Sequence, residues 1–176
     1  VTPFMVNNIY KLAALFVVEF FESDKITPIN EHQHTVICGF AIVGRIVAKE
    51  LSAKSIRFVI ISDNLQHVLL ARERGYMAYF GHLDKRPVLE SLKVEESASV
   101  ILTVTNLVKK KIICQAVLDF YPQAKVIVKI NSVEERKALQ GMGISAFVHA
   151  EHETARLLVK KSIANTIEAE DTLATD

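Results

Sequence analysis

Gly39, Ala41 and Gly44 occupy the three spaced positions of the pattern G-x-G-x-x-G, within the segment VICGFAIVGRIVAKEL. The segment passes from an apolar, β-branched stretch into one of helical periodicity, which is the context in which such a turn can bind a phosphate. Gly39 permits a tight turn, Gly44 lets the helix lie close to the strand, and the helix amino terminus offers free amides to an anion. We therefore predict a phosphate-binding turn between the first strand and the first helix of a domain.

The middle position of this pattern holds Ala41, where glycine is usual. Glycine at this position lets the backbone approach a pyrophosphate closely, and the methyl group of Ala41 would intrude there. A mononucleotide such as AMP, whose single phosphate can rest on the helix amides near Gly44, should therefore bind better than the dinucleotide NAD(H). Tight NAD(H) binding is the alternative, and it requires the turn to adjust to Ala41.

Acidic and polar residues follow two further apolar stretches. After RFVIIS comes Asp63, which lies 24 residues beyond Gly39, close to the spacing of about 20 at which a carboxylate holds a ribose 2′-hydroxyl. Asp63 can equally be the N-cap of a helix from Leu65 onward, and the two roles are compatible. Thr105 and Asn106 follow the fourth apolar stretch, where they either contact a ligand at the carboxyl edge of the sheet or cap the next helix.

Short β-branched runs alternate with segments of helical periodicity from His34 onward, which is typical of parallel βαβ units. The expected strands are His34–Cys38, Arg57–Ser62, Met77–Phe80, Ser99–Val104, Lys125–Ile130 and Ala146–His149. The helices expected between them are Val43–Ala53, Leu65–Arg74, Lys85–Leu92, Leu107–Phe120 and Val133–Met142. Gly75 and Gly141 stand where left-handed helix C-caps belong. The runs VIC and SVILTV are continuously apolar, which favours helices on both faces of the sheet. We predict an α/β fold, a Rossmann-like doubly wound parallel sheet of about six strands with right-handed crossovers.

The sequence divides into three parts. These are an N-terminal helical segment and linker (residues 1–33), the Rossmann-like domain (34–150), and a C-terminal helix with a tail (151–176). In the first part, apolar side chains recur at helical spacing at Ile9, Leu12, Leu15 and Phe16. Docking onto another structure is the favoured role of this face, and packing on its own domain is the alternative. In the third part the helix is expected over Glu151 to Ala169, followed by a frayed end.

Charge and composition exclude several classes of function. The 176 residues contain 21 Lys and Arg against 20 Asp and Glu, a net charge of +1, which disfavours nucleic acid as a partner. Both cysteines, Cys38 and Cys114, lie in apolar stretches, so we expect no disulfide scaffold, and a reducing cytoplasm fits best. The apolar run Leu12 to Val18 is far shorter than the ~20 residues that span a bilayer, and we recognise no signal peptide.

The sequence shows no assembled set of catalytic residues. The six histidines are scattered, and neither H-E-x-x-H nor a nucleophile elbow occurs. His149 and His152 have a spacing that can bind a metal, but solvated or capping side chains are the favoured interpretation, and we predict no metal site. The run Lys109 to Lys111, with Lys160 and Lys161, is interpreted as solvated helix faces, with attraction of an anion or a membrane surface as the alternative. A small NAD(P)-dependent oxidoreductase is the alternative to a ligand-binding regulatory domain, and it would need catalytic residues that the sequence does not assemble.

Several segments, in their order along the chain, resemble the regulator-of-potassium-conductance (RCK, TrkA-N) domain. The segments are CGFAIVGRIVAKEL, FVIISDN, YFGHLD, SLKVEESASVILTVTN and VIVKINSVEERKALQGMGISAFVHA, and the resemblance covers roughly Thr35 to Ser162. The preceding TPFMVNNIYKLA is similar to the stretch that leaves the last membrane helix of Kef-type potassium/proton antiporters. The resemblance implies the cytosolic C-terminal regulator of such an antiporter, or of a related potassium channel, at the cytoplasmic face of a bacterial inner membrane.

The family resemblance also implies a ligand and partners. Members bind a nucleotide such as NAD(H), NADP(H), AMP, ADP or ATP in the Rossmann crevice, and Kef-type members also respond to glutathione and its adducts. We therefore expect AMP or NAD(H) as the ligand. The expected partners are a second copy of the chain in a homodimer and the membrane-embedded transporter or channel part of the same protein.

Carried over by position, the resemblance implies roles for individual residues. The phosphate loop would be Gly39, Phe40, Ala41, Ile42, Val43 and Gly44. Asp63 and Asn64 would contact the ribose, and Gly81 with His82 would form the adenine edge, beside Thr105 and Asn106. Family members commonly have Gly-Asp where this chain has Gly81 and His82, so an imidazole replaces a carboxylate acceptor. This departure and Ala41 both fall in the expected pocket, so either the ligand differs from the usual dinucleotide of the family or the pocket has lost its ligand and remains as a scaffold.

Overall fold

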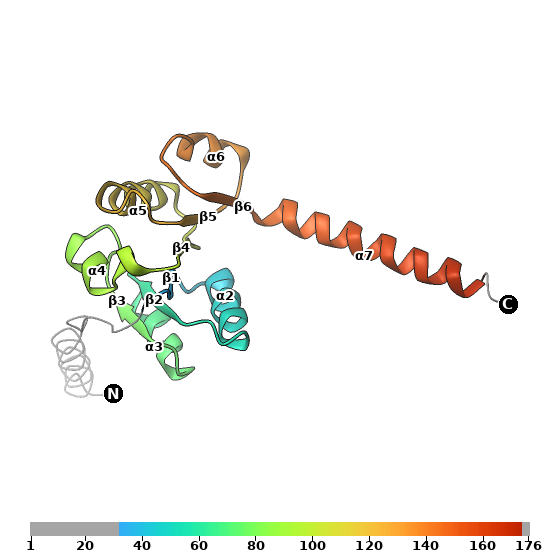
Figure 1. The fold of residues 1–176 in the computed structure, drawn as a ribbon, viewed down its shortest axis with the longest axis horizontal. Coiled ribbons are helices and arrows are strands. Elements are labelled where there is room, and N and C mark those ends of the chain that lie inside the picture. Colours follow the sequence, from blue (N-terminus) through green and yellow to red (C-terminus); the bar gives the residue numbers. More distant parts are fainter. Residues whose placement is uncertain (1–31, 174–176) are drawn as a thin grey trace, which may run out of the picture.

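Within the described residues, six parallel strands form one sheet (Figure 1). The computed structural model describes the backbone of residues 32–173 and the side chains of residues 32–163. The strands are β1 (Thr35–Cys38), β2 (Phe58–Ser62), β3 (Ala78–Phe80), β4 (Ser99–Leu102), β5 (Val126–Ile130) and β6 (Ala146–His149). The helices are α2 (Ile42–Ala53), α3 (Leu65–Glu73), α4 (Arg86–Ser91), the 3-10 helix η1 (Val94–Glu96), α5 (Leu107–Phe120), α6 (Val133–Leu139) and α7 (Ala150–Leu173). The strand order β3-β2-β1-β4-β5-β6 is that of a doubly wound Rossmann-like sheet, which confirms the predicted fold class.

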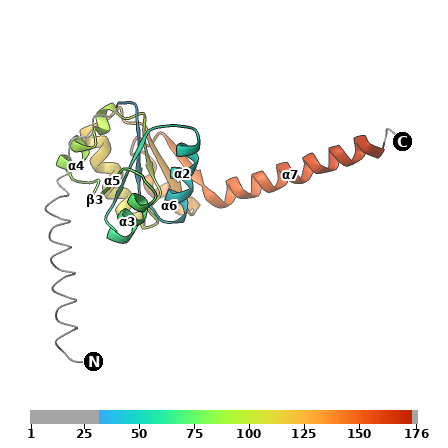
Figure 2. The same ribbon diagram turned by 90° about the horizontal axis from the view of Figure 1, so that it is seen from below.

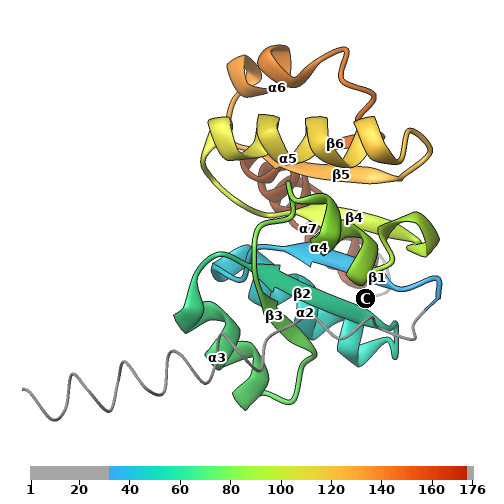
Figure 3. The same ribbon diagram turned by 90° about the vertical axis from the view of Figure 1, so that its left-hand side faces the viewer.

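Helices pack on both faces of the sheet, and each face has its own cluster of buried side chains. Val36 belongs to the cluster formed with α4, α5 and α6, whereas Ile37 packs with Ala48 of α2 and Val68 of α3. In Figure 1, α4 and α5 lie to the left of the strands and α2 to the right. Figure 3 looks onto the sheet with α4 and α5 in front of the strands and α7 behind them. The α7 helix then extends away from the sheet (Figure 2).

The described helices cover only one face of the half of the sheet formed by β4, β5 and β6. Ile37 is fully buried beneath α2 and α3, but Ile101, its register partner on the same face, is half-buried, and Val148 on β6 is 40% exposed. The expectation that helices cover both faces is therefore right for VIC in β1 and wrong for SVILTV in β4, where burial alternates. The α7 helix, which continues from β6, carries exposed apolar side chains at Leu157, Leu158, Val159 and Ile163.

The predicted elements differ from the observed ones mainly at their ends. The β4 ladder ends at Leu102 and not at Val104, the 3-10 helix η1 was not predicted, and α7 continues to Leu173 where a frayed end was expected after Ala169. Gly75 and Gly141 have φ of +79° and +84°, which confirms the left-handed positions after α3 and α6. The predicted helical face of the N-terminal segment lies outside the described residues. None of the helices within residues 32–173 combines the length with the apolar character needed to cross a bilayer.

Candidate functional site

The turn between β1 and α2 is fixed by two glycines and a threonine. Gly39 has φ of +99°, a left-handed value that glycine adopts without strain. A Cβ atom on Gly44 would lie 2.2 Å from the carbonyl oxygen of Gly39, so only glycine lets α2 lie this close to the turn. The buried hydroxyl of Thr103 donates towards the carbonyl oxygens of Cys38 and Gly39, each at 3.1 Å. Thr103 is not among the site residues predicted from the sequence, although a threonine inside an apolar run is a signal that could have revealed it.

The amino terminus of α2 has no side-chain cap. Ala41 is its N-cap residue, with extended backbone at φ −73° and ψ −163°, and the methyl group of Ala41 cannot accept a hydrogen bond from the first-turn amides. The first turn of α2 also carries no acidic side chain. The amides of this turn, together with the positive end of the helix dipole, are therefore available to an anion.

The helices after β2 and β4 are capped by asparagines. The side chain of Asn64 accepts hydrogen bonds from two first-turn amides of α3, at 3.0 and 3.3 Å, and Asn106 accepts one from the amide of Lys109 at 2.9 Å. The alternative role of Asp63 as an N-cap is therefore wrong, because Asn64 holds that position. The capping alternative is confirmed for Asn106, while Thr105 precedes it without a cap role.

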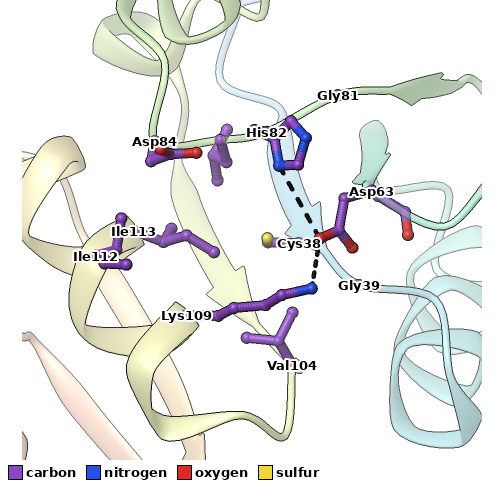
Figure 4. Close-up of a pocket in the computed structure, with 12 residues that line it drawn as sticks. Cys38, Gly39, Asp63, Gly81, His82, Asp84, Val104, Lys109, Ile112 and Ile113 are labelled. Carbon is purple, nitrogen blue, oxygen red and sulfur yellow. Dashed lines mark hydrogen bonds and ion pairs between the residues drawn. The ribbon is translucent and has the colours of Figure 1, made fainter.

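Two adjoining cavities at the carboxyl end of the sheet form a continuous crevice. One cavity, of about 160 Å³, lies between the loop after β3 and the helix α5 (Figure 4), and the other, of about 170 Å³, lies over the turn before α2. Five residues line both cavities: Gly39, Ser62, Asp63, Val104 and Lys109. The carboxyl edge of a doubly wound sheet is where ligands bind in this class of fold.

Most of the predicted site residues line this crevice. They are Gly39, Phe40, Ala41, Asp63, Asn64, Gly81, His82, Thr105 and Asn106. The structure does not bring Ile42, Val43 or Gly44 into the lining; Ile42 is 70% exposed, and Gly44 acts through its close approach to Gly39. Phe40 is fully buried and packs edge-on against Tyr76, with ring centroids 6.2 Å apart, so its ring anchors the turn to the core.

An ion pair spans the crevice. The Nζ atom of Lys109, in the first turn of α5, donates to the Oδ2 atom of Asp63 at 2.5 Å, and the Nδ1 atom of His82 lies 4.0 Å from the same oxygen (Figure 4). The side chains of Lys109 and Asp63 are 52% and 30% exposed. The carboxylate predicted to hold a ribose is thus held by a lysine, which sequence analysis had interpreted as part of a solvated helix face.

The three lysines of α5 have three different environments. Lys109 reaches into the crevice and Lys111 is exposed, but Lys110 is fully buried and its Nζ atom donates to the Oε2 atom of Glu135 on α6 at 2.7 Å. The interpretation of the run as a solvated face is therefore wrong for Lys110. The helix turns by about 100° per residue, so adjacent lysines point in different directions.

Burial and neighbouring charges set the protonation of two further crevice residues. Burial, together with the nearby carboxylate of Asp63, raises the pKa of the Cys38 thiol to about 12, so this thiol is neutral at physiological pH. Burial also tends to raise the pKa of Asp84, but its hydrogen bond and ion pair with Lys85, 2.9 Å away, bring the pKa below its ordinary value. Cys38 is therefore an unreactive part of the cavity wall, and Asp84 is a charged one.

The strand order, the glycine turn and the carboxylate after β2 define a Rossmann-like domain of the doubly wound class. Residues 35–150 match the TrkA-N domain, and the chain belongs to this family. The resemblance inferred from the sequence is thereby confirmed.

The chain is similar in sequence to antiporter proteins. The chain is 25% identical over 142 residues to the putative cation/proton antiporter YbaL of Escherichia coli (strain K12), which covers 81% of this chain and 25% of that protein. It is 25% identical over 153 residues to the chloroplastic K(+) efflux antiporter 1 of Arabidopsis thaliana, which covers 84% of this chain and 13% of that protein. The chain thus spans a quarter or less of the length of these relatives.

Several solved structures share the fold at low sequence identity. The TrkA-N domain of the inner membrane protein YbaL from Escherichia coli is similar with a TM-score of 0.68 at 23% identity, over 75% of this chain and 98% of that one. The GsuK channel bound to NAD is similar with a TM-score of 0.63 at 22% identity, over 69% of this chain and 22% of that one. The Kef CTD of Shewanella denitrificans in its AMP-bound form is similar with a TM-score of 0.62 at 16% identity, over 76% of this chain and 80% of that one.

Proposed function

We propose that this domain binds an adenine nucleotide, AMP or NAD(H), in the crevice and thereby regulates potassium or other cation transport. The regulated part would be the membrane-embedded transporter or channel portion of the same protein, with the domain at the cytoplasmic face of a bacterial inner membrane. The observation that carries the proposal is that the Asp63 carboxylate and the uncapped amides of α2 border the same cavity. A carboxylate suits ribose hydroxyls and the amides suit a phosphate.

The relatives support both parts of this proposal. Those described above are antiporters, and the two nucleotide-bound structures hold AMP in a Kef CTD and NAD in the GsuK channel. Three acidic or thiol groups of the crevice also favour binding over catalysis, because Asp63 is paired with Lys109, Asp84 with Lys85, and the Cys38 thiol is neutral. Turnover of a nicotinamide cofactor by the purified domain would favour the alternative, a small NAD(P)-dependent oxidoreductase.

We expect AMP to bind the purified chain and the variant Asp63→Ala to bind it more weakly. A lost hydrogen bond to a charged group costs about 1.5–3 kcal/mol, or roughly ten- to a hundredfold in affinity. Isothermal titration calorimetry with AMP and NAD(H) measures this effect, and AMP should bind the parent more tightly because of the Ala41 methyl group. Glu73→Ala, at the exposed far end of α3, is the control and should bind as the parent does. Equal affinities for Asp63→Ala and the parent would remove the ribose role of Asp63.

We also propose that the chain forms a homodimer through the uncovered face of β4, β5 and β6. Exposed apolar side chains lie on the elements next to this face: Ile42 and Ile46 of α2 are 70% and 56% exposed, Val148 of β6 is 40% exposed, and Leu158 of α7 is 65% exposed. Covering them with the same surface of a second copy buries apolar area in a symmetric contact, the commonest form of oligomer.

Val148→Glu should therefore convert a dimer into a monomer, because the interface would have to bury an unpaired carboxylate. Light scattering coupled to size-exclusion chromatography, at high micromolar concentration of the full chain, measures the mass. The matched control is Val133→Glu, since Val133 is 49% exposed at the start of α6, on the opposite face of the sheet. A parent that is monomeric at this concentration would contradict the homodimer.

A further inference from the structure

The crevice has a marked shortage of positive charge on its phosphate-binding side. The turn from Gly39 to Gly44 reads GFAIVG and contains no basic residue. Among the described residues that line the two cavities, Lys109 is the only lysine or arginine, and it lines both. A phosphate that reaches the α2 amides therefore has one permanently cationic side chain within the same crevice.

That side chain is already engaged by the group proposed to hold the ribose. Lys109 Nζ lies 2.5 Å from Asp63 Oδ2. Lys109 approaches from α5 and Asp63 from the end of β2, so the pair joins the two sides of the crevice (Figure 4). Ribose hydroxyls that bind the Asp63 carboxylate compete with the ammonium group for the same oxygen. A nucleoside without phosphate that takes this oxygen weakens the ion pair and offers the ammonium group no new anionic partner.

A phosphorylated nucleoside offers the displaced ammonium group a new partner. Lys109 is 52% exposed and has a flexible four-carbon stem, so its head can move without disturbing the core. The cavity over the α2 turn, which Lys109 also lines, is the place where a phosphate would meet the helix amides. Exchange of a carboxylate for a phosphate keeps the ammonium paired, and the carboxylate is freed for the ribose at the same time.

We propose that Lys109 is a specificity-determining residue that pairs with Asp63 in the absence of a nucleotide and moves to the phosphate when a nucleotide binds. The crevice then selects phosphorylated adenosine over adenosine. This inference rests on the proposed nucleotide-binding function and adds to it the residue that recognises the phosphate. Binding also breaks the bridge between β2 and α5, so occupancy of the crevice is coupled to the contact between its two sides.

The test compares AMP with adenosine on the parent and on Lys109→Met, by titration calorimetry of the full chain. Methionine keeps an unbranched stem of similar length and removes the charge. AMP should bind Lys109→Met about tenfold or more weakly, because a charge-assisted hydrogen bond to phosphate is lost. Adenosine should bind Lys109→Met about two- to fivefold more tightly, because the variant lacks the ion pair that competes with ribose, and an exposed ion pair contributes only a small free energy. The two affinities therefore change in opposite directions.

Two further variants complete the design. Lys111→Met removes an exposed charge from the same helix and should leave both affinities unchanged, which controls for net charge. Lys109→Arg keeps the cation and should retain the preference for AMP. If Lys109→Met weakens AMP and adenosine by the same factor, or changes neither, the phosphate-reading role is overturned while nucleotide binding stands. If the parent binds neither AMP nor adenosine, the proposed function itself fails, and this inference fails with it.

Discussion

Gly44→Ala should abolish nucleotide binding and lower the free energy of unfolding by about 3 kcal/mol or more, the upper end of what overpacking costs. A methyl group on residue 44 would lie 2.2 Å from the Gly39 carbonyl oxygen and 3.0 Å from its carbonyl carbon. Both are backbone atoms of the turn, so no side-chain rotation can relieve the contact. The α2 helix must move away from β1, and its first-turn amides move with it. Urea denaturation and AMP titration measure the two effects.

Gly75→Ala is the matched control for this prediction. Gly75 has φ of +79°, but a Cβ atom there would meet nothing within 4 Å. Its cost is the left-handed backbone alone, about 1–2 kcal/mol, and AMP affinity should stay at the parent value. A Gly44→Ala protein that is no less stable than Gly75→Ala, and that still binds AMP, would show that the close approach of α2 to the turn is not required.

The sequence was most informative where a local pattern has one structural solution. Gly39 and Gly44 flank a strand-to-helix turn, and both roles assigned to them, the left-handed turn and the close helix, are found in the structure. Asp63 reaches the same edge because parallel strands all end there, so its position in the crevice follows from the predicted topology. The roles of adjacent residues that can both cap a helix were harder to assign. Asn64 caps α3, although Asp63 had been considered for that position.

Features that depend on which neighbour covers a residue could not be predicted from the local pattern. The run SVILTV reads as a strand buried on both faces, but one face of β4 is only half-buried because no described helix lies over it. The three consecutive lysines of α5 cannot be told apart in the sequence. In the structure, Lys110 is buried and bonded to Glu135 of α6, a neighbour that the local sequence does not reveal. Thr103 likewise looks like a strand residue, and its hydrogen bonds to the turn after β1 connect positions far apart in the sequence.

The ion pair between the buried Lys110 and the half-buried Glu135 gives the other large expected effect. Glu135→Gln should lower the free energy of unfolding by about 3–5 kcal/mol, because it leaves a fully buried ammonium group without its counter-charge. Glutamine can keep the acceptor that faces the backbone amide of Asn131, which donates to Glu135 Oε2 at 2.9 Å. Its NH2 group then replaces Oε1, which accepts from the side-chain amide of Asn131 at 3.1 Å, so the variant loses the charge and this hydrogen bond together. Lys111→Met, beside the pair but exposed, is the control and should change stability little.

A double-mutant cycle separates the charge from the packing. Lys110→Met removes the ammonium group and keeps most of the buried stem, so the double variant Lys110→Met with Glu135→Gln contains neither charge. Replacing both members of a buried pair is often close to neutral, whereas breaking it is costly. We therefore expect the double variant to be more stable than Glu135→Gln alone, with urea denaturation as the measurement. Strictly additive losses would contradict an energetically coupled pair.

The same pair predicts how acid affects the fold. Burial tends to raise the pKa of Glu135, but the hydrogen bond from Lys110 and those from Asn131 outweigh it and hold the pKa below the ordinary value of 4.5. A carboxyl whose pKa is lower in the folded state than in the unfolded one stabilises the fold above its unfolded pKa, and this contribution is lost as the pH falls through the folded pKa. The parent should therefore lose stability below about pH 4.5. Glu135→Gln, which lacks this group, should lose less over the same range, because its uncharged amide does not titrate. Thermal unfolding of both proteins between pH 7 and pH 3 measures the difference, and equal losses in the two would mean that other carboxylates carry the acid sensitivity.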